Sequence, residues 1–209
     1  SLIEFKSQIQ SNKIGNIYAG RSEIGQSLPS WRPESDYRDT VSANKNLGGG
    51  VLLELSHEID YLSWIFGSID WVKSHIGKQS TLDIDVEDSV KVILGFKGMN
   101  DIELIASLNM DFIRHDTTRK CFAIGEKGTL LWDGIAGKVE YFAEGANDWI
   151  TIFLSEQGSD YTYEEEIKSF FSSIESNKLP CISGVDGAYS VAVVEAIKKS
   201  SKIETVVYL

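Results

Sequence analysis

One short stretch of the chain gathers the residue types that could carry acid–base chemistry. Glu54, His57 and Tyr61 recur at positions i, i+3 and i+7, and Asp60 lies one turn after His57. A helix would bring these side chains to one side. Imidazole is the side chain whose ordinary pKa lies closest to neutral pH, so His57 is the candidate proton acceptor or donor. The competing interpretation is a solvated or hydrogen-bonded histidine with a structural role.

The residues around this group predict the helix that would position it. Gly48, Gly49 and Gly50 precede it and fit a loop whose backbone runs close to something else, because no side chain is in the way. Gly67 fits a helix C-cap. A helix with a strong apolar stripe is largely buried, so we expect its polar side to line a cleft. The stripe has the three-and-four spacing of one helical face and consists of Leu52, Leu55, Ile59, Leu62 and Phe66.

A long segment without clear periodicity, residues 25–50, precedes this helix. Long loops inside compact domains are usually functional or disordered, and this one is too rich in aromatic and charged residues for disorder. Its two arginines could bind a carboxylate or the phosphates of a nucleotide sugar. The alternative is a surface loop pinned by Trp31, with ordinary salt bridges to Glu34 or Asp36. On the first interpretation the substrate contacts are Trp31, Arg32, Tyr37, Arg38 and Lys45.

The middle of the chain predicts a sheet. Apolar and polar residues alternate over 86–96 and again over 102–112, which predicts two half-buried antiparallel strands. The turn between them would lie at Gly98, Asn100 and Asp101, so the pair would be a hairpin. We expect further strands near 17–22, 70–77, 117–125, 129–132, 138–143, 149–154 and 204–209.

Helices are expected at both ends of the chain. Leu2, Phe5 and Ile9 have helical spacing, and residues 163–174 carry an apolar face of the same period. A last helix opens at Asp186, and its buried side would include Ala188, Val191, Val194 and Ile197. The whole pattern indicates an α+β fold, a mostly antiparallel open sheet with helices packed on one face.

Composition narrows the partners. The chain has 209 residues, enough for one domain, and a net charge of −11. Such an acidic chain argues against non-specific binding to nucleic acid and against docking on anionic lipid. Cys121 and Cys181 lack zinc-site spacing and are expected to be two reduced, buried thiols. No signal peptide and no membrane-length apolar run is visible, so the cytoplasm is the default compartment.

Two segments resemble a known enzyme family. Residues 31–67, WRPESDYRDTVSANKNLGGGVLLELSHEIDYLSWIFG, resemble the start of the C-terminal domain of the glucose–fructose oxidoreductase / inositol dehydrogenase (Gfo/Idh/MocA) family. Residues 186–202, DGAYSVAVVEAIKKSSK, resemble the closing helix of that family. The resemblance implies that residues 1–209 are the substrate-binding and oligomerisation domain of a two-domain dehydrogenase.

The resemblance also implies roles for single residues. His57 would be the catalytic acid or base, and Glu54 would be the acid that orients the sugar or the imidazole. Tyr61 would also contact the substrate. Many members place an aspartate four residues before the histidine, whereas Glu54 lies three residues before His57. The family's catalytic lysine belongs to the nucleotide domain, so Lys45 is expected only to contact substrate or an anion.

The cofactor is expected to bind outside this chain. No G-x-G-x-x-G follows a strand here, so NAD or NADP would be held by a Rossmann domain elsewhere in the full-length enzyme and not tightly by this chain. The substrate would be a sugar, nucleotide sugar or cyclitol. Some of the abundant aromatic residues could lie on the open face of the sheet and make it a homo-oligomer interface. The alternatives are a non-catalytic ligand-sensing regulator and an oligomerisation module of the same fold.

Overall fold

The computed structural model describes residues 1–97, 103–156 and 161–209. In these residues one nine-stranded sheet has the order β8-β7-β6-β5-β1-β4-β3-β2-β9. Neighbouring strands pair antiparallel except β1 and β4, which are parallel. The strands are β1 Ile17–Gly25, β2 Ile69–Gly77, β3 Ser89–Phe96, β4 Leu104–Asp111, β5 Thr118–Gly125, β6 Gly128–Asp133, β7 Lys138–Ala143, β8 Ile150–Leu154 and β9 Val207–Tyr208.

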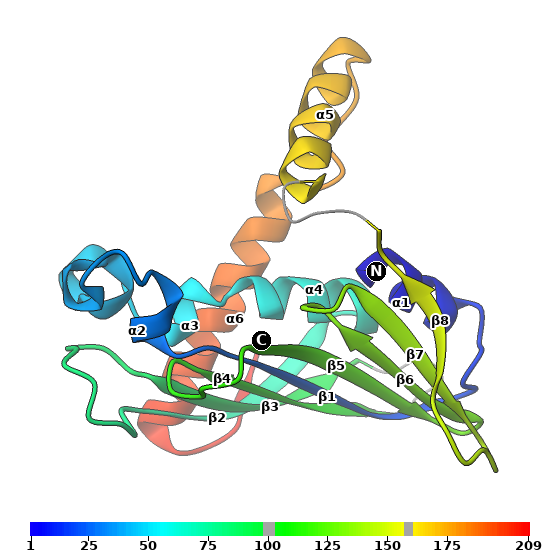
Figure 1. The fold of residues 1–209 in the computed structure, drawn as a ribbon, viewed down its shortest axis with the longest axis horizontal. Coiled ribbons are helices and arrows are strands. Elements are labelled where there is room, and N and C mark those ends of the chain that lie inside the picture. The colour runs from blue at the N-terminus through cyan, green and yellow to red at the C-terminus, as the bar shows by residue number, and fades with distance from the viewer. Residues whose placement is uncertain (98–102, 157–160) are drawn as a thin grey trace.

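The helices lie mainly on one side of this sheet, which confirms the predicted α+β fold (Figure 1). The segment predicted as irregular contains α2 and three short 3-10 turns, Tyr37–Asp39, Val41–Ala43 and Lys45–Leu47. No helix in the described ranges is long and apolar enough to cross a membrane. The helices are α1 Leu2–Gln10, α2 Leu28–Trp31, α3 Val51–Glu54, α4 His57–Phe66, α5 Tyr161–Glu175 and α6 Gly184–Ile203.

The alternating apolar residues of β3 and β4 form part of the core. β3 and β4 pair antiparallel with Val92 opposite Leu108 and Leu94 opposite Ala106, and their inward residues are buried. The predicted turn of this hairpin, Gly98, Asn100 and Asp101, lies outside the described residues. Inward side chains of the sheet pack against α4, whose Ile59 and Leu62 are fully buried. The apolar stripe predicted around Leu52–Leu62 is therefore a core face.

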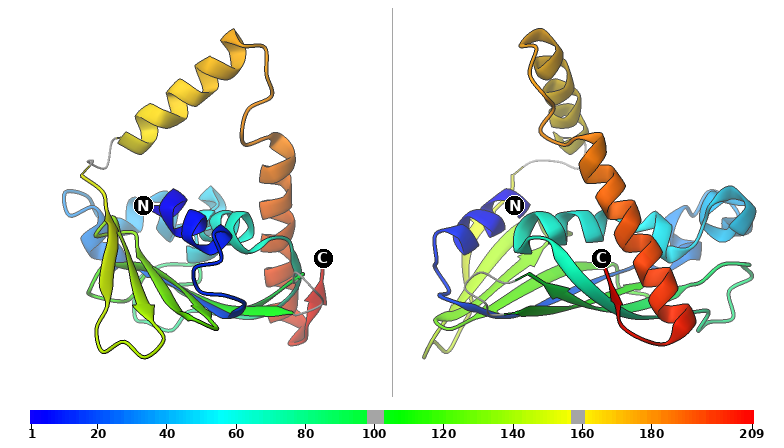
Figure 2. Two further views of the ribbon diagram at one scale, coloured as in Figure 1. Left: turned by 90° about the vertical axis from the view of Figure 1, so that its right-hand side faces the viewer. Right: turned by 180° about the vertical axis from the view of Figure 1, so that it is seen from behind.

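The two C-terminal helices depart from the expected packing. α5 projects away from the sheet (Figure 2), and its apolar residues Tyr163, Ile167, Phe170, Phe171 and Ile174 are each more than half exposed. The buried residues of α6 begin at Val193, so the prediction that Ala188 and Val191 are buried is wrong. The buried residues of α6 are Val193, Val194, Ala196, Ile197 and Ser200.

Candidate functional site

The glycine turn before α3 packs against two other parts of the chain. A Cβ on Gly49 would lie 2.1 Å from the carbonyl oxygen of Val41, and one on Gly50 would lie 2.5 Å from the Glu87 carboxylate. Gly50 also has a φ of +108°, which disfavours any other residue. These contacts confirm the predicted close approach of backbone. They fix the start of α3 against the strand that begins after Glu87.

The periodicity predicted one continuous helix after this turn, but the structure contains two. α3 ends at Glu54 and α4 begins at His57. The backbone tightens between them, because the N–H groups of Ser56, Glu58 and Ile59 donate to carbonyls three residues back, those of Leu53, Leu55 and Ser56. The periodic pattern did not show this break because both halves keep their apolar residues on the core side. The break places His57 in the first turn of α4 instead of mid-helix.

His57 lies beside a buried ion pair. Glu58 has no exposed surface, and its Oε1 lies 2.8 Å from Nε of Arg119 and 3.3 Å from Nε2 of His57. Side chains of adjacent residues in a regular helix do not face each other, and this contact forms where α3 gives way to α4. The His57 side chain remains 48% exposed, so it can reach both the buried pair and solvent.

Arg119 comes from β5, and aromatic rings hold its side chain in addition to the Glu58 carboxylate. Its guanidinium lies over the rings of Trp132 and Tyr61, with centroid distances of 5.3 and 5.9 Å. Its side chain is 32% exposed. The aromatic rings and the Glu58 carboxylate together limit the positions that the guanidinium can take. Arg119 therefore presents a fixed positive charge next to His57.

Burial and charge shift two pKa values in opposite directions. Burial raises the pKa of Glu58 to about 7, while the positive charge of Arg119 acts against that rise. Partial burial and then Arg119 lower the pKa of His57 to about 4, and the backbone of Glu54 and the Asp60 carboxylate act against that fall. Solvent screens part of the effect on His57 because almost half of its side chain is exposed. His57 is neutral at pH 7 and can accept a proton.

The neighbouring predicted residues have different surroundings. Tyr61 is buried, its hydroxyl lies 2.7 Å from Oγ of Ser22, and burial raises its pKa. The side chain of Asp60 accepts a hydrogen bond from Ser190 on α6, at 3.3 Å. Glu54 is partly exposed. The break in the helix thus separates Glu54, the acid predicted to act with His57, from Tyr61, which lies in the core.

The predicted loop residues form a second group, tied to the loop between β2 and β3. The Tyr37 hydroxyl accepts from the Asp83 N–H at 3.2 Å, and the Lys45 N–H donates to Asp85 at 2.7 Å. Arg38 pairs with Asp36, as the alternative interpretation of this loop anticipated. No hydrogen bond or ion pair links this group to His57 in the described residues.

The space between the loop aromatics is small. A hollow of about 10 Å³ lies among Trp31, Arg32 and Tyr37, roughly the room that one water needs. Trp31 packs against Phe112 with a ring-centroid distance of 5.9 Å. Any substrate contact of this group would therefore be made at the surface of the loop.

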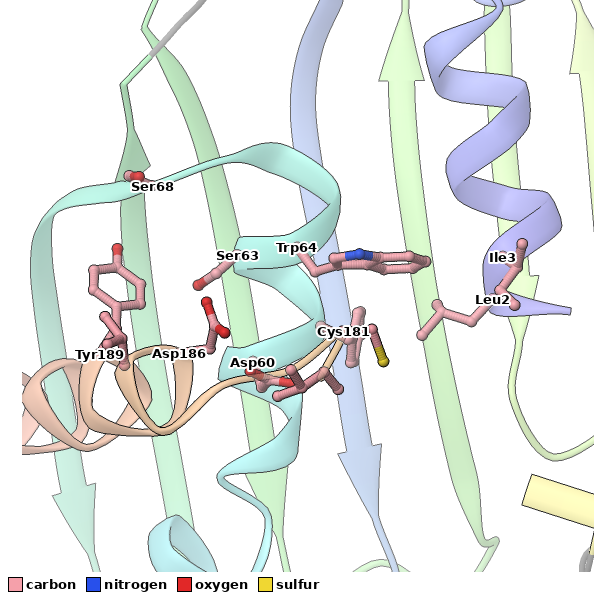
Figure 3. Close-up of a pocket in the computed structure, with 12 residues that line it drawn as sticks. Leu2, Ile3, Asp60, Ser63, Trp64, Ser68, Cys181, Asp186 and Tyr189 are labelled. Carbon is pink, nitrogen blue, oxygen red and sulfur yellow. The ribbon is translucent and has the colours of Figure 1, made fainter. Parts of the chain in front are cut away.

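A larger cavity of about 710 Å³ opens beside α4 (Figure 3). The Trp64 ring and Leu2 form part of its apolar wall, and Asp60, Ser63 and Tyr189 supply polar groups. Cys181, expected to be buried, lies exposed at this cavity, while Cys121 is buried as predicted; both are free thiols. His57, Glu58 and Arg119 do not line this cavity. This larger cavity is therefore not the place where the acid–base residues gather.

The glycine turn does not fit the phosphates of a dinucleotide. The N–H groups of Gly48, Gly49 and Gly50 donate to carbonyls of Lys45, Asn44 and Ser42, and those of the next two residues donate to Glu87. Phosphate binding at a helix start needs free N–H groups. The Glu87 carboxylate against Gly50 would also repel an anion. Likewise, no group of three or more potential ligand side chains in the described residues is arranged to hold a metal ion.

Glu58 and Arg119 are the residues that the sequence reasoning missed. One signal pointed to Glu58, which lies three residues after Leu55 and four before Leu62, inside the apolar stripe. An acid at such a position must find a partner or lose its charge. Arg119 lies 61 residues further along the chain, and nothing local connects it to Glu58.

Comparison with known proteins agrees with this architecture. Residues 6–209 match the family described as an oxidoreductase family, C-terminal alpha/beta domain. Myo-inositol 2-dehydrogenase of Thermotoga maritima is 24% identical over 94% of this chain and 57% of its own length. Levoglucosan dehydrogenase in complex with NADH has a similar fold, with a TM-score of 0.82 and 19% identity over 98% of this chain and 61% of that one.

A further similar structure is the WlbA dehydrogenase from Bordetella pertussis in complex with NADH and UDP-GlcNAcA. It has a TM-score of 0.72 and 19% identity, over 99% of this chain and 60% of that one. The chain thus spans 57–61% of the length of these three proteins. Because the family match runs through almost all of its residues, the chain belongs to the Gfo/Idh/MocA oxidoreductase family, of which it is the C-terminal alpha/beta domain.

Proposed function

We propose that this chain is the substrate-binding, histidine-bearing domain of an NAD(P)-dependent dehydrogenase that acts on a sugar, nucleotide sugar or cyclitol. The observation that carries the proposal is His57, a half-exposed neutral imidazole beside a buried carboxylate–guanidinium pair, in a chain of an oxidoreductase family. The relatives and neighbours named above act on or bind compounds of these three classes.

The chemistry divides between this chain and a nucleotide-binding domain outside it. A bound nicotinamide would supply the hydride acceptor. His57 would take the proton from the substrate hydroxyl as its carbon is oxidised, which requires the neutral imidazole that the site favours. Glu54, Lys45 and the aromatic and arginine side chains of residues 31–38 would contact the substrate.

Turnover by the full-length gene product tests the proposal. A panel of sugars, nucleotide sugars and cyclitols is offered with NAD⁺ or NADP⁺, and we expect reduction of one cofactor with members of the panel. The 209-residue chain alone should show no turnover. His57→Ala should lower kcat by about 10²- to 10⁴-fold, the usual contribution of a positioned general base. If His57→Asn keeps kcat within a few-fold of wild type, His57 has a structural role and the site assignment is wrong.

We also propose that the uncovered face of the sheet joins two copies of the chain. One row across this face contains Ile93, Arg21 and Phe122, on β3, β1 and β5, and Ile105 lies beside it. Ile93 and Ile105 are 45% and 43% exposed although they are apolar. Light scattering should show a dimer or larger assembly that Ile93→Asp weakens. A strict monomer at high micromolar concentration would contradict this proposal.

One observation favours a second candidate, a ligand-sensing regulator. The cavity beside Trp64 is large enough for a small molecule, and His57 is not among the residues that line it. A regulator would bind a sugar without turning it over. Calorimetry of the same compounds with the full-length protein, together with the turnover assay, separates the two functions.

A further inference from the structure

Glu58 is a buried titratable group to which the proposed chemistry gives no role. It is the second residue of α4 and has no exposed surface. Its Oε1 contacts both His57 and Arg119, whereas its Oε2 is buried without a hydrogen-bond partner in the described residues. Burying a carboxylate with one unpaired oxygen lowers the stability of the fold, so stability alone does not explain why Glu58 is there.

We propose that Glu58, and not Glu54, is the positioning residue for His57: its carboxylate, anchored by Arg119, faces Nε2 of the imidazole and exchanges a proton with it. This inference rests on the proposed function of His57. Glu58 itself touches no substrate, because it is wholly enclosed. It acts through the imidazole, as the orienting carboxylate does in other histidine-based sites.

Arg119 anchors the Glu58 carboxylate. Arg119 lies over the rings of Trp132 and Tyr61, so the guanidinium cannot follow a moving carboxylate far. Its Nε lies 2.8 Å from Oε1, a normal charge-assisted hydrogen-bond distance. The 3.3 Å between Oε1 and Nε2 of His57 is therefore set by two elements, β5 and α4, and not by a free surface side chain.

A proton taken up by His57 can pass on to Glu58. When a substrate hydroxyl gives its proton to His57, the ring holds two protons and carries a positive charge. Transfer of the Nε2 proton to Oε1 of Glu58 leaves a neutral imidazole and a neutral carboxyl group beside Arg119. Once the oxidised product has left, the proton passes back from Oε1 to Nε2, and the ring releases a proton to solvent from its exposed edge.

The surrounding charges make this exchange feasible. Arg119 and Cys121 face the pair from β5, and Asp60 and Tyr61 face it from α4. Burial raises the pKa of Glu58 to about 7, so the carboxyl group can hold or release a proton near neutral pH. The Cys121 thiol and the Tyr61 hydroxyl stay protonated, because burial raises the pKa of each.

Nuclear magnetic resonance of the 209-residue chain tests the exchange without any turnover. The ring nitrogens of His57 and the carboxyl carbon of Glu58 are followed from pH 4 to pH 9. We expect an inflection of the His57 signals at the pH where Glu58 titrates. In Glu58→Gln this inflection should disappear, because no titrating carboxyl group then faces the ring. The Glu54→Gln variant is the matched control and should leave both titrations unchanged.

Two results would overturn the proposal. One is a His57 titration in the wild-type chain with no inflection where the Glu58 carbon titrates, a test that does not depend on whether any variant folds. The other is an inflection of the His57 signals near the pKa of Glu58, about 7, that persists unchanged in Glu58→Gln. Linked titrations in a protein that turns over no substrate would instead refute the dehydrogenase proposal and leave the positioning role of Glu58 in place.

The active enzyme gives a second measurement. In the full-length protein Glu58→Gln should lower kcat about 10- to 100-fold, with KM within about twofold of wild type, as expected for a residue that acts through another. The pH profile of kcat should shift, and Glu58→Asp should restore part of the rate. A change confined to KM, with an unmoved pH profile, would contradict the positioning role.

Discussion

Two acid–arginine pairs in this chain differ most in their burial. Asp36 and Arg38 lie two residues apart in an exposed turn, with side chains 38% and 55% exposed. Glu58 and Arg119 come from α4 and β5, and the carboxylate is fully enclosed. The Arg38 side chain holds the pKa of Asp36 at about 2, whereas burial raises the pKa of Glu58 to about 7. The pKa of a carboxylate paired with arginine is thus lowered at the surface and raised in the interior, although Asp36 also accepts more hydrogen bonds from its arginine than Glu58 does.

The difference shows why an ion pair by itself does not mark a functional site. At the surface, water already solvates both ions, so a pair with arginine only makes the carboxylate a weaker base. In the interior the loss of hydration outweighs the attraction of the guanidinium, and the carboxylate becomes a group that titrates near neutrality. Sites of acid–base catalysis favour the second situation.

The largest expected effect comes from breaking the buried pair. Arg119→Ala leaves the Glu58 carboxylate enclosed without its partner, which should lower the free energy of unfolding by about 3–5 kcal/mol at pH 8. Urea denaturation of the 209-residue chain measures the loss. Arg119→Met is the matched variant, because it retains much of the contact with Trp132 but not the charge. A loss in both variants no greater than that in Arg38→Ala would show that burial does not distinguish the pairs.

The pH dependence of stability is the next largest effect. The folded chain keeps a proton on Glu58 between its ordinary pKa of 4.5 and about 7, where the unfolded chain has lost it. The free energy of unfolding should therefore fall as pH rises through this window, by roughly 3 kcal/mol in total. Because His57 titrates in the opposite sense, the measurement is made in the His57→Asn background.

A second variant isolates the contribution of Glu58. His57→Asn/Glu58→Gln has no titrating group at this position, so its stability should lack the fall between pH 4.5 and 7. Chemical denaturation at pH 4, 6 and 8 compares the two proteins. Parallel stability curves would mean that Glu58 titrates at its ordinary pKa in the folded chain, and the contrast with Asp36 would be lost.

The smallest effect is expected at the exposed pair. Asp36→Asn and Arg38→Ala remove one partner each, but the remaining charge is solvated, so the midpoint of urea denaturation should not change measurably at pH 7. The wild-type contribution of Asp36, whose folded pKa is lowered, would be lost only as pH falls below its ordinary pKa of 3.8. A clear loss at pH 7 would indicate that the 36–38 turn has a structural role that its exposure conceals.

Local pattern was enough to predict most elements of the fold. Alternation over 86–96 and 102–112 predicts strands that the structure contains as β3 and β4, because a strand with one buried face must alternate whatever its neighbours are. The same holds for the apolar stripe of α4 and for the close approach at Gly49. Such features depend on residues near one another in the chain, so the sequence carries them directly.

The sequence by itself determined the strands, the helices, the glycine turn and the presence of a histidine among acids. Only the tertiary structure decided that the helix breaks before His57, that β1 lies parallel to β4, and that the apolar face of α5 has no cover in the described residues. It also decided which acid lies against the imidazole, because Arg119 reaches Glu58 across 61 residues of chain. The pKa of a carboxylate depends on burial and on charges brought from distant segments, and neither is present until the sheet and α4 have packed together.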